Sequence, residues 1–250
     1  MNLSDCICDS SDGNLQRVRY FSRQLLDAHD LTDDQAYHRA KQRMHNRLLH
    51  GWGIVCGLEV SANPTKPAPS NVKISVGYAL SPQGDEVCVP DEVAFDLATC
   101  TAGPAPGCCS TPCSPILATR VDPAKPFWIG IKFTQCPSRP VRVPPVGCGC
   151  DDTACEYSRI RDSFEVTCLD KLPDSYPKEE QPEVDVCNYL KETKVIPCPP
   201  CPDSPWIVLA KMQPAVGEAS GEFPYTLVFD DRRLLLSVAV IQQDIAQKCT

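Results

Sequence analysis

The cysteines with the most suggestive spacing for chemistry lie in two short motifs. Cys148-Gly149-Cys150 is followed by Cys155, and Cys198-Pro199-Pro200-Cys201 lies further along the chain. Structural zinc takes four thiolates or imidazoles in a tetrahedron, and Cys-x-Cys or Cys-x-x-Cys turns supply neighbouring ligands. Any four of these five cysteines could close a zinc site, with Cys136 as a sixth candidate. Disulfide pairing and unliganded loop thiols are the alternatives, and the sequence leaves all three open.

Two other uses of cysteine are disfavoured. A redox Cys-x-x-Cys motif sits at the N-terminus of a helix, whereas prolines surround Cys198 and Cys201 and a strand is expected after them. Cys56 has His45 and His50 nearby in sequence, which suggests a thiolate nucleophile. However, it falls in an apolar run that is typical of a strand, where we expect a buried cysteine acting as a small hydrophobic residue.

Familiar catalytic motifs are missing from the sequence. It has no phosphate-binding glycine loop with its lysine, no Gly-x-Ser-x-Gly turn, and no His-x-x-x-His pair for a helical metal site. Its paired acids fit solvated turns. We therefore expect no catalytic residue, no bound cofactor other than possible zinc, and no enzymatic activity.

Composition narrows the class of protein. The 250 residues include 17 cysteines and 25 prolines, with a formal net charge of -8. The odd cysteine count and the absence of a signal-like N-terminus rank reduced thiols or metal ligands above a disulfide framework. The acidic balance makes nucleic acid a poor partner, and no apolar run is long enough to span a membrane. A cytoplasmic location is expected.

One helix is expected near the N-terminus. Residues 1–14 are expected to form a polar, flexible arm, and residues 15–52 a helical docking element. Thr32-Asp33-Asp34-Gln35 has the form of a capping box, which predicts a helix over 33–49 with Thr32 as the N-cap and Gly51 as a left-handed C-terminal cap. Ala36, Ala40, Met44 and Leu48 give this helix a narrow apolar stripe.

The pattern then becomes strand-like, and residues 53–250 are expected to form one β-rich domain. Ser81–Asp85 is a turn, so Val72 to Pro90 is expected to be a hairpin. Surface insertions are expected at 99–114 and 173–205, and a closing helix at 234–247. The fold class is therefore mainly β (α+β), with the N-terminal helix packed on an elaborated antiparallel β domain with long Pro/Cys-rich loops. The expected strands are 53–60, 72–80, 86–90, 93–97, 127–134, 164–169, 206–212 and 225–229.

Longer motifs carry a resemblance to a known family. Residues 45–58 read HNRLLHGWGIVCGL, and they follow Arg19-Tyr20-Phe21 and Gln24-Leu25-Leu26. Together with Cys155-Glu156-Tyr157-Ser158-Arg159-Ile160, these motifs resemble a family of cysteine-rich proteins associated with phage-tail-like contractile injection systems, over residues 17–212. The resemblance implies a structural, non-enzymatic subunit at the baseplate or a peripheral position. It implies other particle subunits (baseplate, sheath or tube proteins) as partners, with multiple copies per assembly.

Two further hypotheses concern named residues. Arginine and aromatic side chains are enriched at interface hot spots, so Tyr37, Arg39, Arg43, Arg47 and Trp52 are candidate interface residues, with packing of the helix on its own sheet as the alternative.

Gly51 and Gly53 are expected to form a structural junction, at which the helix ends and a strand begins. The alternative overall function is a zinc-stabilised, cysteine-rich binding module or effector-like protein that is not permanently part of a particle.

Overall fold

The computed structural model describes residues 15–62, 71–97, 121–122, 124–142, 155–176, 203–214, 225–236, 241–244 and 247. In these ranges the protein is mainly β, as the sequence predicts. Helix α2 (Ala28–His45) and the π-turn η1 (Asn46–His50) precede ten strands. The strands are β1 (Gly53–Gly57), β2 (Val60–Ala62), β3 (Asn71–Ile74), β4 (Gly77–Leu80), β5 (Glu86–Val89), β6 (Val93–Asp96), β7 (Phe127–Arg142), β8 (Cys155–Leu169), β9 (Ile207–Pro214) and β10 (Tyr225–Val228).

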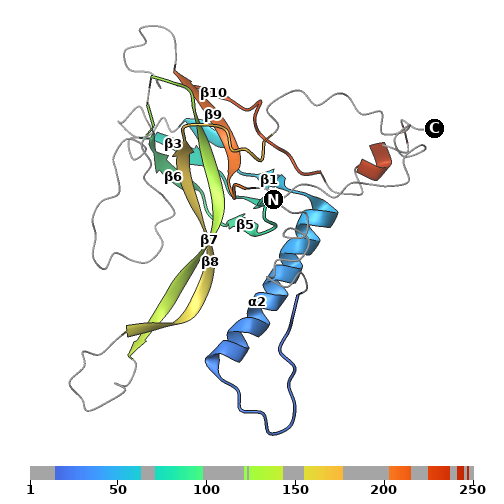
Figure 1. Cartoon of the computed structure of the whole chain (residues 1–250). Helices are drawn as coiled ribbons and strands as arrows, with labels where there is room; N and C mark the ends of the chain where they lie inside the picture. Colours follow the sequence, from blue (N-terminus) through green and yellow to red (C-terminus); the bar gives the residue numbers. More distant parts are fainter. Residues whose placement is uncertain are drawn as a thin grey trace.

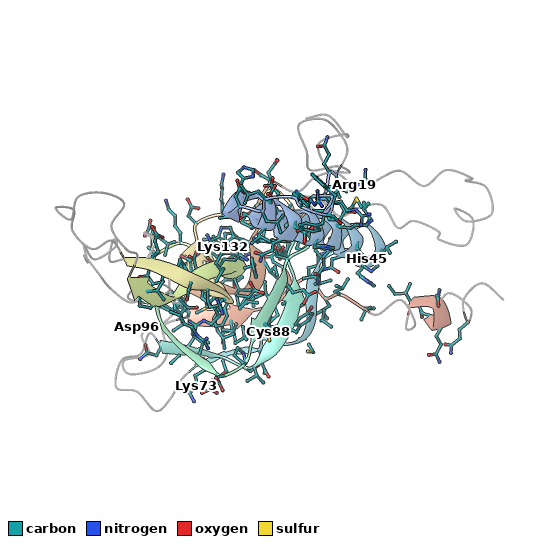
Figure 2. All side chains as sticks on the ribbon, turned by 90° about the horizontal axis from the view of Figure 1, so that it is seen from below. Arg19, His45, Lys73, Cys88, Asp96 and Lys132 are labelled. Atoms are coloured by element: carbon teal, nitrogen blue, oxygen red, sulfur yellow. The ribbon has the colours of Figure 1, made fainter. Side chains whose placement is uncertain are left out.

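The described strands form three antiparallel sheets around one core. Their orders are β1-β4-β5, β2-β3-β6 and β10-β9-β7-β8. One apolar cluster joins all three sheets, since it contains Ile54, Phe95 and Ile129 together with residues of β9. In Figure 2 helix α2 lies across one side of the strands, with His45 near its end. The β part is therefore a single packed body, with the helix on its surface.

Two of the expected strands are each divided between two sheets. The prediction of one strand over 53–60 is wrong, because the chain turns at Leu58, whose φ is 54°, and passes from β1 to β2. The stretch 72–80 is likewise two strands, β3 and β4. The two turns are held together where Leu58 N donates to Val76 O (3.2 Å) and Ser75 N donates to Glu59 O (2.9 Å). A hydrophobic pattern does not record such a turn, since the buried residues continue through it.

The hairpin around Ser81–Asp85 is confirmed for β4 and β5. Gly84 N donates to Ser81 O (2.8 Å), and Ser81 N donates to Asp85 O (2.8 Å). The Ser81 hydroxyl accepts from Asp85 N at 2.9 Å. This turn has a fixed shape, and it carries the main contact with helix α2.

The helix begins one turn earlier than predicted. Asp27, and not Thr32, is the N-cap: its Oδ1 accepts from His29 N (2.8 Å) and Asp30 N (2.9 Å), and Asp30 Oδ2 accepts from Asp27 N. Thr32 lies inside the helix and donates to Ala28 O. Both stretches fit a capping box, and the earlier one starts the helix.

Strands β7 and β8 form the longest hairpin. Their pairing runs from Trp128 opposite Leu169 to Arg142 opposite Cys155. Strand β9 pairs with β7 only over Phe127–Ile131, so the outer part of the hairpin is a two-stranded ribbon. Figure 1 shows this ribbon and helix α2 projecting from the same side of the sheets.

The C-terminal helix is shorter than predicted. Leu234 lies in extended chain and forms a parallel bridge with Ile54, and helical residues appear at 241–244. The first part of the expected helix instead packs alongside β1, because Ile54 N donates to Arg233 O and Leu235 N donates to Ile54 O. Residues 1–14 and 99–114 lie outside the described ranges, as do residues 177–202 of the expected 173–205 insertion. Tyr176, just before them, is 5% exposed and belongs to the packed domain.

Candidate docking surface

Helix α2 is folded without contributing to the core. None of its 18 residues is buried. The predicted apolar stripe therefore does not pack as expected: Ala36 is exposed, and Leu48 retains 37% exposure. Alanine side chains are too small to bury much area, so this face adds little to the association of helix and sheet.

Large apolar side chains gather at the start of the helix and in the segment before it. Leu25 is 91% exposed and Phe21 64%, and Leu31 and Leu26 are 52% and 46% exposed. We call these four residues the apolar tip. Single exposed leucines are ordinary on a soluble protein, but four large ones within eleven residues of chain are typical of an interaction surface.

Polar contacts attach the other half of the helix to the β domain. Arg43 Nε and Nη2 donate to the two oxygens of the Asp85 carboxylate, each at 2.7 Å. Arg39 Nη2 donates to the same carboxylate at 3.2 Å, and its Nη1 donates to Gln135 at 2.6 Å. The Asp85 side chain is only 10% exposed. A forked arginine pair on a nearly buried carboxylate fixes direction as well as distance, so it orients the whole helix.

The π-turn adds a buried amide contact next to this ion pair. Asn46, the one buried residue of η1, donates from Nδ2 to Gly84 O at 2.9 Å. The wider turn ends where Gly51 N donates to Asn46 O. It thereby places Asn46 against the β4–β5 turn, and a single-turn π-bulge commonly serves to position a side chain in this way.

Gly51 ends the helical segment, but not in the left-handed helical conformation that the sequence predicts. Its φ of 79° and ψ of -152° form an extended combination that only glycine adopts readily, and Gly53 has φ 142°. Between them, Trp52 packs edge-on against Tyr176 at 4.9 Å between ring centroids. The Arg233 guanidinium lies 4.4 Å from the centroid of the Trp52 ring, and its Nε donates to Trp52 O. The strand that follows is β1.

The five candidate interface residues are largely engaged within the chain. Arg39, Arg43 and Trp52 make the contacts described above. Tyr37 is half-buried under Lys41, whose Nζ lies 5.8 Å from the ring centroid, and Arg47 is also half-buried. Their part in an intermolecular interface stays a prediction.

Sequence reasoning missed three features of this region: the apolar tip, and the two residues Asp85 and Asn46 that receive and anchor the helix. Asp85 follows the Pro-Gln-Gly turn and Asn46 lies in the motif HNRLLHGWG, so both lie in segments already singled out for other reasons. Neither residue type reveals its partner without the three-dimensional arrangement.

The predicted zinc site falls mostly outside the described part of the chain. Cys148, Cys150, Cys198 and Cys201 lie beyond it, and Cys155 is the first residue of β8, with its side chain not described. Among the described residues, no group of three or more His, Cys, Asp or Glu side chains is placed to hold a metal. Zinc binding stays a prediction, and measuring metal content per chain before and after chelation tests it.

The remaining cysteines correct two expectations. Cys136 and Cys168 are disulfide-bonded, so Cys136 is not a zinc ligand here. The strand register places them seven residues apart, about 23 Å, so they belong to different disulfides. Cys56 is exposed, not buried, because a bulge after Ile54 turns both Val55 and Cys56 outward. Cys88 is also a free, exposed thiol.

Comparisons with known proteins add little to this description. No family model matches the chain, and no curated protein matches it. One similar solved chain belongs to the TssK-TssF-TssG baseplate subcomplex of a type VI secretion system, with 11% identity and a TM-score of 0.40, covering 94% of this chain and 68% of that one. Likeness at this level does not establish a shared function. No described helix is both long and apolar enough to cross a membrane.

Proposed function

We propose that this protein is a non-enzymatic structural subunit of a phage-tail-like contractile injection system, at the baseplate or another peripheral position. It acts by docking its apolar tip onto a neighbouring subunit. Baseplate, sheath or tube proteins are the candidate partners, and a symmetric particle would hold several copies.

The observation that carries the proposal is the contrast between the C-terminal half of α2 and the apolar tip at and before its start. The C-terminal half is fixed to the β domain through Asp85 and Gly84, whereas the tip exposes Phe21, Leu25 and Leu31. A helix held in a set direction with large apolar side chains at its far end is suited to burial in a partner. The sequence resemblance over residues 17–212 supports the kind of partner.

Replacing one tip residue tests the docking. Leu25 is 91% exposed, so Leu25→Asp leaves folding intact while placing a charge in the proposed interface. Burying a leucine side chain contributes about 1.5–3 kcal/mol, so we expect its loss to weaken association roughly tenfold to a hundredfold. The measurement is the amount of protein that co-sediments with sheath and tube proteins when intact particles are purified from producing cells.

Val76→Asp is the matched control, because Val76 is also an exposed apolar residue (52%) but lies on the β domain, away from the tip. We expect this variant to enter particles as the unmodified protein does. Equal incorporation of both variants would refute docking through the tip. An unmodified chain that never co-sediments with the particle would refute the subunit proposal itself.

A further inference from the structure

Strand β8 has an exposed outer edge over most of its first half. It is the last strand of the sheet β10-β9-β7-β8. From Glu156 to Asp162 every side chain is exposed, including Ile160 at 66% and Tyr157 at 45%. We define the distal ribbon as Gln135–Arg142 paired with Cys155–Asp162. A two-stranded ribbon of this kind is only marginally stable alone in water, so it gains by pairing with a further strand.

The two edges of the ribbon differ in what they can accept. On the β7 side, Pro137 and Pro140 lack backbone donors, and Arg139 between them has φ 57°. These features block strand addition. On the β8 side, the stretch from Cys155 to Leu169 contains no proline and no glycine. The β8 edge is therefore the one that can add a strand.

The side chains beside this edge define what a partner strand must carry. Tyr157, Arg159 and Arg161 alternate along one face, and all three are exposed. Arg159 Nη1 donates to the neighbouring Ser158 O at 2.7 Å, and the other N–H groups of the Arg159 guanidinium can donate to a partner. Ile160 lies on the opposite face, paired with Pro137. An arginine, an apolar residue and an arginine thus follow one another along the edge.

The charge of this face contrasts with that of the whole protein. Its two arginines lie on a chain whose formal net charge is -8. Helix α2 cannot neutralise them, because Arg39 contacts Phe133 and Gln135, which share the face of Ile160. The arginine face is turned away from the helix.

We infer that the β8 edge of the distal ribbon binds an extended strand of a partner protein by β-augmentation. The partner strand carries acidic residues at alternate positions, opposite Arg159 and Arg161, with a β-branched residue between them beside Ile160. Main-chain hydrogen bonds supply affinity, and the alternating side chains supply specificity. This surface is separate from the apolar tip, so it can exist whether or not the tip docks as proposed.

A short labelled peptide tests the inference on the full-length protein. The probe is the blocked peptide Thr-Val-Glu-Ile-Glu-Val-Thr, and its control replaces both Glu by Lys. We expect fluorescence anisotropy to show at least tenfold tighter binding of the Glu peptide. N-methylation of alternate backbone amides then separates strand pairing from charge attraction: methylating one edge of the peptide should abolish binding, and methylating the other should not.

Protein variants identify the site. Arg159→Glu with Arg161→Glu should reverse the preference, so that the Lys peptide binds better than the Glu peptide. Lys125→Glu is the control, because Lys125 is also an exposed cation (77%) but lies away from the ribbon, paired with Asp122. It should leave binding unchanged.

Any of the following results would overturn the inference: no binding of the Glu peptide, equal tolerance of both N-methylated peptides, or an unchanged preference in the double variant. Competition by single-stranded poly-U RNA at equal strength would instead indicate a polyanion site, and would also overturn it. If the double variant does not fold, the N-methylated peptides still decide the question on the unmodified protein.

Discussion

Helix α2 and the β4–β5 turn lie so close together that adding a single methyl group, in Gly84→Ala, would force them apart. Gly84 has φ 91°, and a Cβ there would lie 2.3 Å from Arg43 O and 2.9 Å from Arg43 C. Both atoms belong to the helix backbone, so the helix would have to move. Strain at the positive φ costs about 1–3 kcal/mol, and overpacking costs about 1–3 kcal/mol more. We expect Gly84→Ala to lower the free energy of unfolding by about 2–6 kcal/mol.

Gly51→Ala is the matched control. Gly51 has a similar φ of 79°, but a Cβ there would meet only Leu235 Cδ1, at an ordinary 3.9 Å. This variant carries the backbone strain without the clash, so we expect it to cost about 1–3 kcal/mol. Urea unfolding measures both losses.

Hydrogen exchange shows where the Gly84→Ala loss arises. Displacing the helix would break the contacts of Asn46 and Arg43. Relative to the unmodified protein, the amides of α2 should therefore exchange faster in Gly84→Ala, and the increase should be much smaller in Gly51→Ala. Two variants of equal stability, with unchanged exchange in α2, would refute the close approach.

Two further predictions concern buried and exposed groups. Burial raises the pKa of the Tyr176 phenol above its usual 10. The neutral phenol therefore contributes fully to the free energy of unfolding below about pH 10. That contribution is lost as the pH rises further, by about 1.4 kcal/mol per pH unit. In Tyr176→Phe, the free energy of unfolding should fall less steeply with alkaline pH. The variant should also lose about 1–3 kcal/mol at neutral pH, because Val208 N loses its acceptor. An equally steep alkaline fall in the variant would contradict this. In rapid alkylation followed by mass spectrometry, Cys56 and Cys88 should react in the folded protein, and Cys136 and Cys168 only after unfolding and reduction. Protection of Cys56 would show that the bulge does not expose it.

The elements with strong local signals could be predicted. The β4–β5 turn is specified by proline and glycine between two apolar runs, and the end of the helix by Gly51, since both depend on backbone conformations within a few residues. The sequence predicts the helix start at Thr32, but Asp27–Asp30, just before it, also fits a capping box, and only this earlier stretch caps the helix.

The docking surface could be anticipated in location but not in composition. Arg39, Arg43 and Trp52 have side-chain types that are typical of interfaces, but they contact their own β domain. The exposure of Leu25 and Leu31 depends on how far the helix extends beyond the sheets. Apolar residues at helical spacing look the same in sequence whether a core covers them or not.

The sequence by itself determined the mainly β class, the N-terminal helix, the β4–β5 hairpin and the glycine junction, because each follows from propensities and turns within a short stretch of chain. Tertiary structure alone decided that Asp85 holds the helix, that Cys56 faces solvent, and that the distal ribbon has one blocked edge and one open edge. These features depend on which strands become neighbours and where their pairing stops, and such long-range choices are made by the packing of the whole core.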